Sequence, residues 1–328
     1  MGYKVDSVAS HATGLYKLFN PNLNLFHNSI FAAKIRNNSQ FSMQRHTFFK
    51  KEFSILFFFV SLYKNSKNMI KPVLHSYDFG QNVIAFSTTR QGGYSEGNYG
   101  QFNINRYCGD SAEAITQNRQ ALCQLLQIDD RRLLMPHQVH LTEVAVIDNA
   151  FLRLDDSERR QSLEGVDAIM TDRIRVCIGV STADCIPVLL YDSVRRAVCA
   201  IHAGWRGTQQ RIVEKAVRTM TETYGTVPSD IVAQIGPGIG LDSFEVGDEV
   251  YDAFAEAGFE MASISERRSK WHIDLPACNK LQLLATGVKP ENVRMSGVCT
   301  YKAHDTFFSA RRLGINSGRI FTAIMMKS

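Results

Sequence analysis

Hydrophobic and polar positions follow regular periods between residues 69 and 328, and these periods predict both strands and helices. The segment NVIAFSTT (82–89) alternates as a half-buried strand does, and the glycine-rich stretch RQGGYSEGNYG after it predicts a loop. A helix is expected from Asp110, with Glu113 as its capping-box partner. Its apolar residues fall on one face, at Ile115, Leu122, Leu125 and Leu126.

The middle of the chain holds the densest apolar runs. Three of them predict neighbouring strands: VCIGVS (176–181), IPVLLY (186–191) and AVCAIH (197–202). The turn-like segment DSVRR joins the last two of these strands.

The segments after these strands continue the mixed pattern. A helix is predicted over 208–225, capped by Thr208 and ended by Gly225. A strand at 231–236 and a helix at 248–258 follow. No linker or internal repeat interrupts residues 69–328, so we expect one domain of the α/β (α+β) class there.

Residues 1–68 differ from the rest in charge and pattern. They carry nine Lys/Arg and two Asp/Glu, a net +7, whereas the remainder carries 28 basic and 30 acidic residues, a net −2. They also hold ten of the twenty phenylalanines, with no lasting period. We interpret them as an N-terminal extension from a mis-called start, with a disordered tail or a weak membrane-surface segment as alternatives.

Composition limits location and partners. The chain is 45% hydrophobic and 21% charged, which is typical of a globular protein. Its seven cysteines are widely spaced, without C-x-x-C, which favours a reducing, cytoplasmic setting. The run SILFFFVSLY (54–63) is about half the roughly 20 residues that a membrane span needs. Since the basic charge belongs to the extension, we expect neither nucleic acid nor membrane as a partner.

Two histidines and a cysteine are candidate metal ligands. His140 closes PHQVH, Cys185 precedes a predicted strand, and His202 lies where another predicted strand ends. Two imidazoles and a thiolate are typical of catalytic zinc, with a fourth position left for water or substrate. The wide spacing matches no short zinc motif, so a buried cysteine with two hydrogen-bonded histidines remains the alternative. His137 competes with His140 for the same role.

Several residues are candidate binders of an anionic substrate. Arg206 follows His202 by four residues, Arg90 lies in the glycine-rich loop, and Arg311 and Arg312 lie in FFSARRLG. Arginine binds phosphate bidentately, although each of these residues is also compatible with an exposed surface arginine. Asn103 is a further candidate.

Familiar nucleotide and serine-nucleophile motifs are missing. GPGIG (236–240) lacks the spacing of G-x-G-x-x-G and no Walker lysine is present, so it predicts a tight turn. No G-x-S-x-G occurs either.

Taken together, ten stretches resemble one protein family. They are FSTTRQGGYS, FNINRYCGD, NRQAL, PHQVH, VDAIMTD, STADCIPVLL, AIHAGWRGT, IGPGIGLDSFEVGDEV, VCTY and FFSARRLGINSGR. In this order they resemble the laccase-domain family of purine nucleoside phosphorylases, once described as multicopper polyphenol oxidases. The likeness runs from about Met69 to the C-terminus. Leu141 departs from it, because many relatives have glycine there.

The resemblance implies a fold, a metal site and an activity. The fold is a compact α/β/β/α arrangement of mixed sheets with outer helices. The metal is zinc on His140, Cys185 and His202. The implied activities are phosphorolysis of adenosine, inosine, guanosine and methylthioadenosine, and deamination of adenosine. The substrates are then purine nucleosides and phosphate, and a homo-oligomer is compatible with the sequence.

Catalytic roles follow from this hypothesis. Cys185 and His202 hold the metal, Arg206 holds phosphate with Arg90 or Arg311, and Asp184 or Asp167 acts as an acid or orients a ligand. Three rival functions stay open. They are a copper-dependent polyphenol oxidase, an amide hydrolase acting on a peptidoglycan precursor, and a metal-binding module without catalysis.

Overall fold

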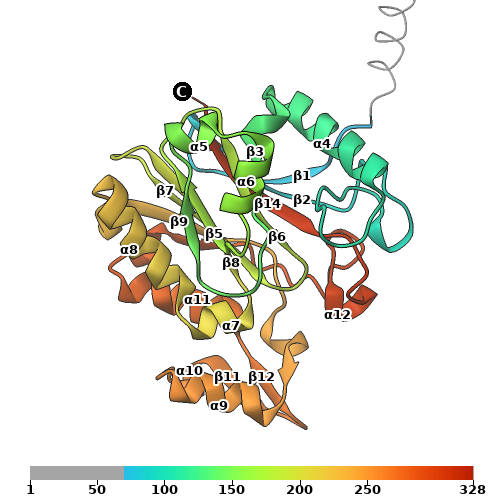
Figure 1. Ribbon diagram of the computed structural model, residues 1–328. Coiled ribbons are helices and arrows are strands. Elements are labelled where there is room, and N and C mark those ends of the chain that lie inside the picture. Colours follow the sequence, from blue (N-terminus) through green and yellow to red (C-terminus); the bar gives the residue numbers. More distant parts are fainter. Residues whose placement is uncertain (1–69, 328) are drawn as a thin grey trace, which may run out of the picture. The chain divides into compact units, whose positions relative to one another are not determined.

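The computed structural model describes residues 70–327, whose strands form two large sheets and one small sheet with helices around them (Figure 1). The expected extension 1–68 and its boundary at Met69 lie outside the described residues and remain predictions.

Two large sheets form the centre of this unit. The first has five strands in the order β1-β2-β14-β6-β3, in which only β3 and β6 are parallel. Its strands are β1 (Leu74–Tyr77), β2 (Val83–Thr88), β14 (Ile320–Met326), β6 (Cys177–Thr182) and β3 (Leu133–Leu134). The second sheet has six strands in the order β13-β9-β7-β8-β5-β4. They are β13 (Val293–Met295), β9 (Ile231–Ile235), β7 (Ile186–Asp192), β8 (Ala197–Ala203), β5 (Ala168–Thr171) and β4 (Val144–Val146).

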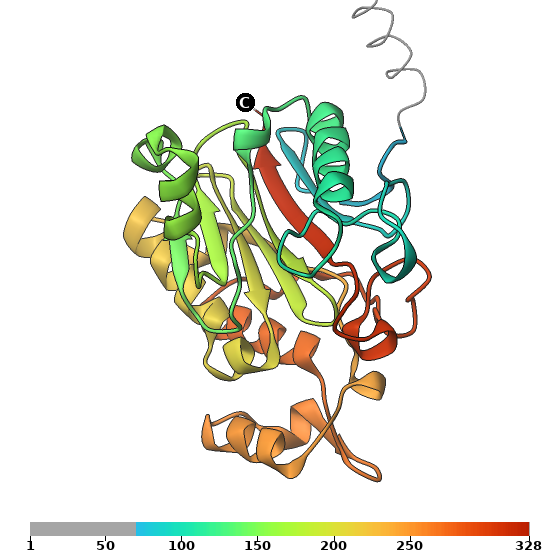
Figure 2. The same cartoon turned by 45° about the vertical axis from the view of Figure 1, so that its right-hand side comes forward.

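Helices cover the outer faces of both sheets. Helix α4 (Ala112–Leu126) lies on the first sheet, as Figure 2 shows. Helices α8 (Ile212–Tyr224) and α11 (Leu275–Ala285) lie on the second. The inner faces meet in a core where Ile178 and Ile324 pack with Leu189 and Ala200. These layers confirm the expected α/β/β/α class.

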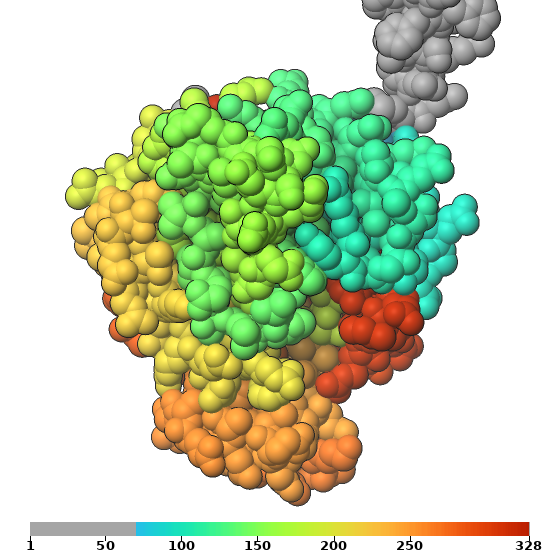
Figure 3. Space-filling view, viewed as in Figure 1, coloured from blue at the N-terminus to red at the C-terminus, as the bar shows by residue number. Residues whose placement is uncertain are grey.

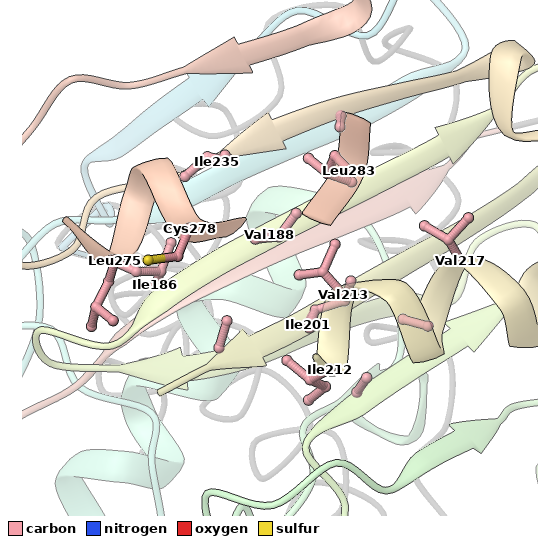
Figure 4. Close-up of a cluster of buried hydrophobic side chains, with 14 of the residues drawn as sticks. Ile186, Val188, Ile201, Ile212, Val213, Val217, Ile235, Leu275, Cys278 and Leu283 are labelled. Atoms are coloured by element: carbon pink, nitrogen blue, oxygen red, sulfur yellow. The ribbon is translucent and has the colours of Figure 1, made fainter. Parts of the chain in front are cut away.

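Strand alternation decides which side chains reach which layer. Along β7, Ile186, Val188 and Leu190 point toward the helices, whereas Leu189 joins the core between the sheets. Figure 4 shows the helix side, where Ile186 and Val188 lie near side chains of α8 and α11. Since β7 and β8 are covered on both faces, their near-continuous apolar runs are explained.

A small lobe projects from this body. It contains the three-stranded sheet β10-β12-β11. Its elements are β10 (Glu245–Val246), α9 (Asp248–Glu256), α10 (Met261–Ile264), β11 (Ser265–Arg267) and β12 (Trp271–Ile273). Figure 3 shows the lobe in orange below the body, with the surface hollowed where it approaches the red C-terminal segment. Of this lobe, the periodicity predicted only α9.

Two predicted helix starts are wrong. Helix α4 begins at Ala112 and is capped by Ser111, because the Asp110 carboxylate is bonded to Ser95 and Asn103. The predicted helix at 208–225 is two helices, α7 (Trp205–Gln209) and α8.

Thr208 therefore lies inside α7. It is fully buried, and its hydroxyl lies within hydrogen-bonding distance of Asn279. The chain turns at Arg211, whose φ is 62°, before α8 starts. The predicted stop at Gly225 is confirmed, since that glycine adopts the left-handed conformation with φ 69°.

Three short helices complete the described chain: α5 (Asn149–Arg153), α6 (Asp156–Ser162) and α12 (Ala310–Leu313). Across residues 70–327, every helix is too short or too polar to traverse a lipid bilayer.

Candidate metal centre

His140, Cys185 and His202 converge although 62 positions separate the first from the last. One donor atom from each lies within 4.8 Å of the others. His202 is the second-last residue of β8 and pairs with Pro187 of β7. Cys185 immediately precedes β7, and His140 lies in the loop between β3 and β4. The two rings meet edge to face, with centroids 4.8 Å apart. Of the two histidines of PHQVH, His140 lies near Cys185 and His202, whereas His137 is not in the group.

The ring of His202 is fixed by Asp167. Its Nδ1 lies 2.7 Å from Oδ1 of Asp167, and both side chains are almost completely buried. The backbone N–H of His202 also donates to the carbonyl oxygen of Asp167, at 2.8 Å. With Nδ1 occupied in this way, Nε2 is the nitrogen that is free to bind a metal.

The same carboxylate holds the loop that carries His140. The N–H groups of Val139, His140 and Leu141 donate to Asp167 at 3.3, 3.0 and 2.9 Å. His140 itself has a φ of 65°, a left-handed conformation that costs a residue other than glycine about 1–2 kcal/mol. This conformation turns three successive N–H groups toward one anion.

Two glycines of HAGWRG provide the space for the site. A Cβ on Gly204 would lie 3.0 Å from Cδ2 of His140 and 3.2 Å from Sγ of Cys185. A Cβ on Gly207 would lie 2.9 Å from the carbonyl oxygen of Leu141. Any side chain at 204 would therefore occupy the space between the ligands, and one at 207 would push α7 away from the ligand loop.

Cys185 and His202 shift each other's pKa. Burial would raise the pKa of the Cys185 thiol, but the charge of His202 and hydrogen bonds from both histidines lower it to about 6. Burial would lower the pKa of His202, but the Cys185 thiolate and Asp167 raise it to about 9. A thiolate and two imidazoles are a donor set that suits zinc. The absence of a side chain at Gly204 lets His140 and Cys185 lie close to each other.

Asp184, the residue before Cys185, accepts three hydrogen bonds from distant parts of the chain. Its two carboxylate oxygens accept hydrogen bonds from the hydroxyl of Thr300 and the backbone N–H of Arg311, both at 2.7 Å. Its carbonyl accepts from Ile239 at 2.8 Å. Asp184 has a φ of 86°, a strained backbone conformation, and these hydrogen bonds stabilise it next to the candidate ligand Cys185. A cavity of about 640 Å³ opens between residues 240–242 and 297–303, and its walls include none of the three ligands.

The candidate anion binders lie in different environments. Arg206 is exposed, with its guanidinium 4.3 Å from the ring of Trp205. The guanidinium of Arg311 donates to the carbonyl of Glu245 in the lobe, and that of Arg90 donates to the carbonyls of Gly100 and His304. Asn103 is fully buried. Its amide bonds to Asp110 and accepts from two backbone N–H groups.

Arg312, the neighbour of Arg311, is also exposed and lies over the ring of Tyr301.

Two contributions to the site were not predicted, the gap at Gly204 and the hydrogen bond from Thr300 to Asp184. The pairing of His137 with Glu164 at 2.6 Å, which lies outside the ligand group, was not predicted either. The glycine beside His202 was the one visible signal. Thr300 and Glu164 are 116 and 27 positions from their partners, and no sequence spacing links such pairs.

Comparisons with known proteins identify the family of this chain. The family model described as multi-copper polyphenol oxidoreductase laccase matches residues 84–327. The chain is 46% identical over 270 residues to a purine nucleoside phosphorylase of Bacteroides thetaiotaomicron, covering 81% of this chain and 99% of the relative. It is 45% identical over 260 residues to adenosine deaminase RL5 of an unknown prokaryotic organism, covering 77% and 99%.

Two solved structures share the fold. The hypothetical protein YfiH of Bacillus licheniformis matches with a TM-score of 0.73 at 27% identity, over 79% of this chain and all of that one. YlmD of Geobacillus stearothermophilus matches with a TM-score of 0.71 at 29% identity, over 75% of this chain and 93% of that one. The chain therefore belongs to the laccase-like family that includes these YfiH and YlmD proteins.

Proposed function

We propose that this protein is a zinc-dependent purine nucleoside phosphorylase that also deaminates adenosine. The observation that carries the proposal is the convergence of His140, Cys185 and His202 on one point. The relatives at 46% and 45% identity, named as a purine nucleoside phosphorylase and an adenosine deaminase, supply the substrate class.

Phosphorolysis exchanges one bond for another at the ribose. A phosphate oxygen forms a bond to C1′, the bond from C1′ to purine N9 breaks, and the departing base takes up a proton. In deamination, water adds at C6 of adenosine and ammonia leaves, which gives inosine. Zinc held by His140, Cys185 and His202 supplies Lewis acidity and lowers the pKa of water when bound.

Arg206 is our candidate for the phosphate. Within residues 70–327 its guanidinium forms no hydrogen bond to the protein, whereas the guanidinium groups of Arg90 and Arg311 donate hydrogen bonds to backbone carbonyls. Arg206 also lies four residues after His202, on the first turn of α7. A free guanidinium fork can bind phosphate with two parallel hydrogen bonds. Arg90, Arg311 and Asn103 stay candidate substrate or phosphate binders, although their polar groups are bonded to the protein in this structure.

Asp167 and Asp184 are better suited to holding the site than to donating a proton. Both carboxylates accept hydrogen bonds at each oxygen. Because both oxygens of each carboxylate already have partners in the protein, we assign the two residues to positioning rather than to proton transfer.

The decisive experiment combines metal analysis with product analysis on adenosine. The purified protein is expected to carry about one zinc per chain and to release adenine and ribose 1-phosphate only in phosphate buffer. Inosine would report deamination, and one chromatogram resolves all three products. A zinc-loaded protein that turns over none of adenosine, inosine and guanosine would contradict the assignment.

Copper oxidase chemistry is the less favourable alternative. Two histidines and a cysteine also suit copper, but the chain has nine histidines in total, fewer than a multicopper site with its several centres requires. Phenol oxidation by copper-loaded protein, compared with nucleoside turnover by zinc-loaded protein, separates the two.

One observation favours an amide hydrolase as a second candidate. His202 lies between the Cys185 thiolate and the Asp167 carboxylate, the order of nucleophile, base and orienting acid in thiol hydrolases. Release of an amine from a cell-wall peptide amide by zinc-free protein would support this reaction. Loss of that activity on zinc removal would leave the thiol mechanism unsupported.

None of the seven cysteines, all within the described residues, forms a disulfide, which supports our proposal of a cytoplasmic location.

A further inference from the structure

The Asp167 carboxylate is saturated by groups that belong to the metal site. Its Oδ1 accepts from His202 Nδ1 and from the N–H of His140, at 2.7 and 3.0 Å. Its Oδ2 accepts from the N–H groups of Val139 and Leu141, at 3.3 and 2.9 Å. A carboxylate offers about four acceptor positions, so this one has none left for substrate. Asp167 is fully buried.

The ligand loop is shaped as an anion-binding nest whose anion is internal. Successive N–H groups converge on one anion in nests and turns, and here the middle residue, His140, is left-handed with a φ of 65°. The carboxylate accepts hydrogen bonds that offset the unfavourable backbone conformation of His140. It also engages Nδ1 of His202, so that Nε2 is the ring nitrogen left for a metal. One side chain thus sets the direction of two ligands that are far apart in sequence.

We propose that Asp167 is the positioning residue that sets the metal affinity of this site, by holding the His140 loop and the His202 ring together. The inference rests on the proposed metal site and deepens it, because it names what prearranges two of the three ligands. It also removes Asp167 from the list of candidate general acids.

The chain offers a matched control three positions away. Glu164 bonds to Nδ1 of His137 at 2.6 Å, the same type of contact at nearly the same distance. That pair is exposed, with side-chain exposures of 35% and 59%, and His137 is not among the three ligands. Glu164→Gln therefore removes a carboxylate–histidine contact from the same region without touching the ligand set.

The test is zinc affinity measured by competition with a chromophoric chelator, for the wild type, Asp167→Asn and Glu164→Gln. Loss of an outer partner of a metal ligand typically weakens binding by about 10–100-fold, and we expect that loss for Asp167→Asn. Glu164→Gln should stay within about twofold of the wild type. Equal affinities in both variants would overturn the inference, while a wild type that binds no zinc would overturn the proposed metal site instead.

Cobalt-loaded protein tests whether the effect is positional. The visible spectrum of cobalt reports the geometry of its ligands, so Asp167→Asn should shift the bands while Glu164→Gln leaves them unchanged. An unshifted spectrum with unchanged affinity would contradict a positioning role.

The wild type alone supplies a test if Asp167→Asn does not fold. In the zinc-loaded protein, nitrogen-15 spectra should show the proton of His202 on Nδ1, and the amides of residues 139–141 should exchange slowly although they lie in a loop. A proton on Nε2, or rapid exchange at all three amides, would overturn the inference.

Discussion

Two histidine–carboxylate pairs in this protein have almost the same contact distance and entirely different surroundings. His137 lies 2.6 Å from Glu164 and His202 lies 2.7 Å from Asp167. The first pair is exposed, and the ring of His137 stacks on Tyr107 with centroids 4.1 Å apart. The second pair is buried, with side-chain exposures of 2% and 0%.

The difference lies in what else each carboxylate holds. Water and salt screen the exposed pair, so its contribution to stability is about 0–1 kcal/mol. The buried carboxylate also binds three backbone N–H groups of the His140 loop, and breaking such a network leaves uncompensated buried groups. Burial and the shared partners of the carboxylate, rather than the contact itself, distinguish the His202 pair from the His137 pair. His140, the exposed histidine of the ligand group, is held by its backbone N–H on the same buried carboxylate.

Replacing the rings themselves should give the largest contrast. His202→Ala is expected to lower bound zinc from about one equivalent to near zero and to reduce nucleoside turnover by more than about 100-fold, since a ligand is lost. His137→Ala should retain zinc and most activity. Metal analysis beside initial rates measures both, and a His137→Ala protein without zinc would erase the distinction between the two pairs.

A methyl group at Gly204 should disturb the buried pair from the other side. The Cβ would lie 3.0 Å from His140 and 3.2 Å from Cys185, so Gly204→Ala is expected to cost about 1–3 kcal/mol of stability and to weaken zinc binding. Gly240→Ala is the control. Gly240 has a similar extended backbone at a helix start, but its nearest neighbour would be the Cβ of Cys299 at 3.5 Å. Thermal melts and zinc titrations of both variants test this, and equal behaviour would contradict the packing argument.

Arg206→Lys should give a smaller and more selective change. Replacing a bidentate fork by a point charge is expected to raise the KM for phosphate by about tenfold and to leave deamination nearly unchanged. Arg267→Lys is a matched control, because Arg267 also lies over a tryptophan, 5.0 Å from the Trp271 ring, but in the lobe. Equal loss of both reactions in Arg206→Lys would count against a phosphate role.

The sequence predicted the layers because their strands and helices have long periodic patterns. The strands β6, β7, β8 and β9 were expected within about one residue of their observed bounds. The lobe was largely missed because its strands have two or three residues, too few for any period to show. The break between α7 and α8 was missed because the partners of the chain near it are far away in sequence. The carbonyl of Thr208 accepts from the side chain of Gln282, 74 positions away, at 2.7 Å.

The candidate site could be predicted by residue type but not by arrangement. A thiol and two imidazoles at the ends of predicted strands indicated a metal, and the three residues do converge. The sequence could not show whether Asp167 or Asp184 holds the ligands, because the contacts of Asp167 with them span 26 to 35 positions. Asn103 and Arg90 were predicted as substrate binders from their functional groups, and the sequence could not show that these groups have partners within the protein. Their binding role stays a prediction.

The smallest effect should appear in the pH dependence of the metal-free protein. The folded-state pKa of Cys185 is lowered from 9.0 to about 6, so its contribution to stability is present above pH 9 and is lost as the pH falls through 6. The folded-state pKa of His202 is raised from 6.5 to about 9, so its contribution is present below pH 6.5 and is lost as the pH rises through 9.

The two contributions are coupled, because each ionised group stabilises the other, and the thiolate–imidazolium pair therefore exists between about pH 6 and 9. The melting temperature in chelator should pass through a broad maximum in that window, by a few degrees, and Cys185→Ser should flatten the profile. Glu164→Gln should keep the maximum, because the exposed pair adds little. A profile that responds equally to both substitutions would show that burial does not distinguish the two pairs.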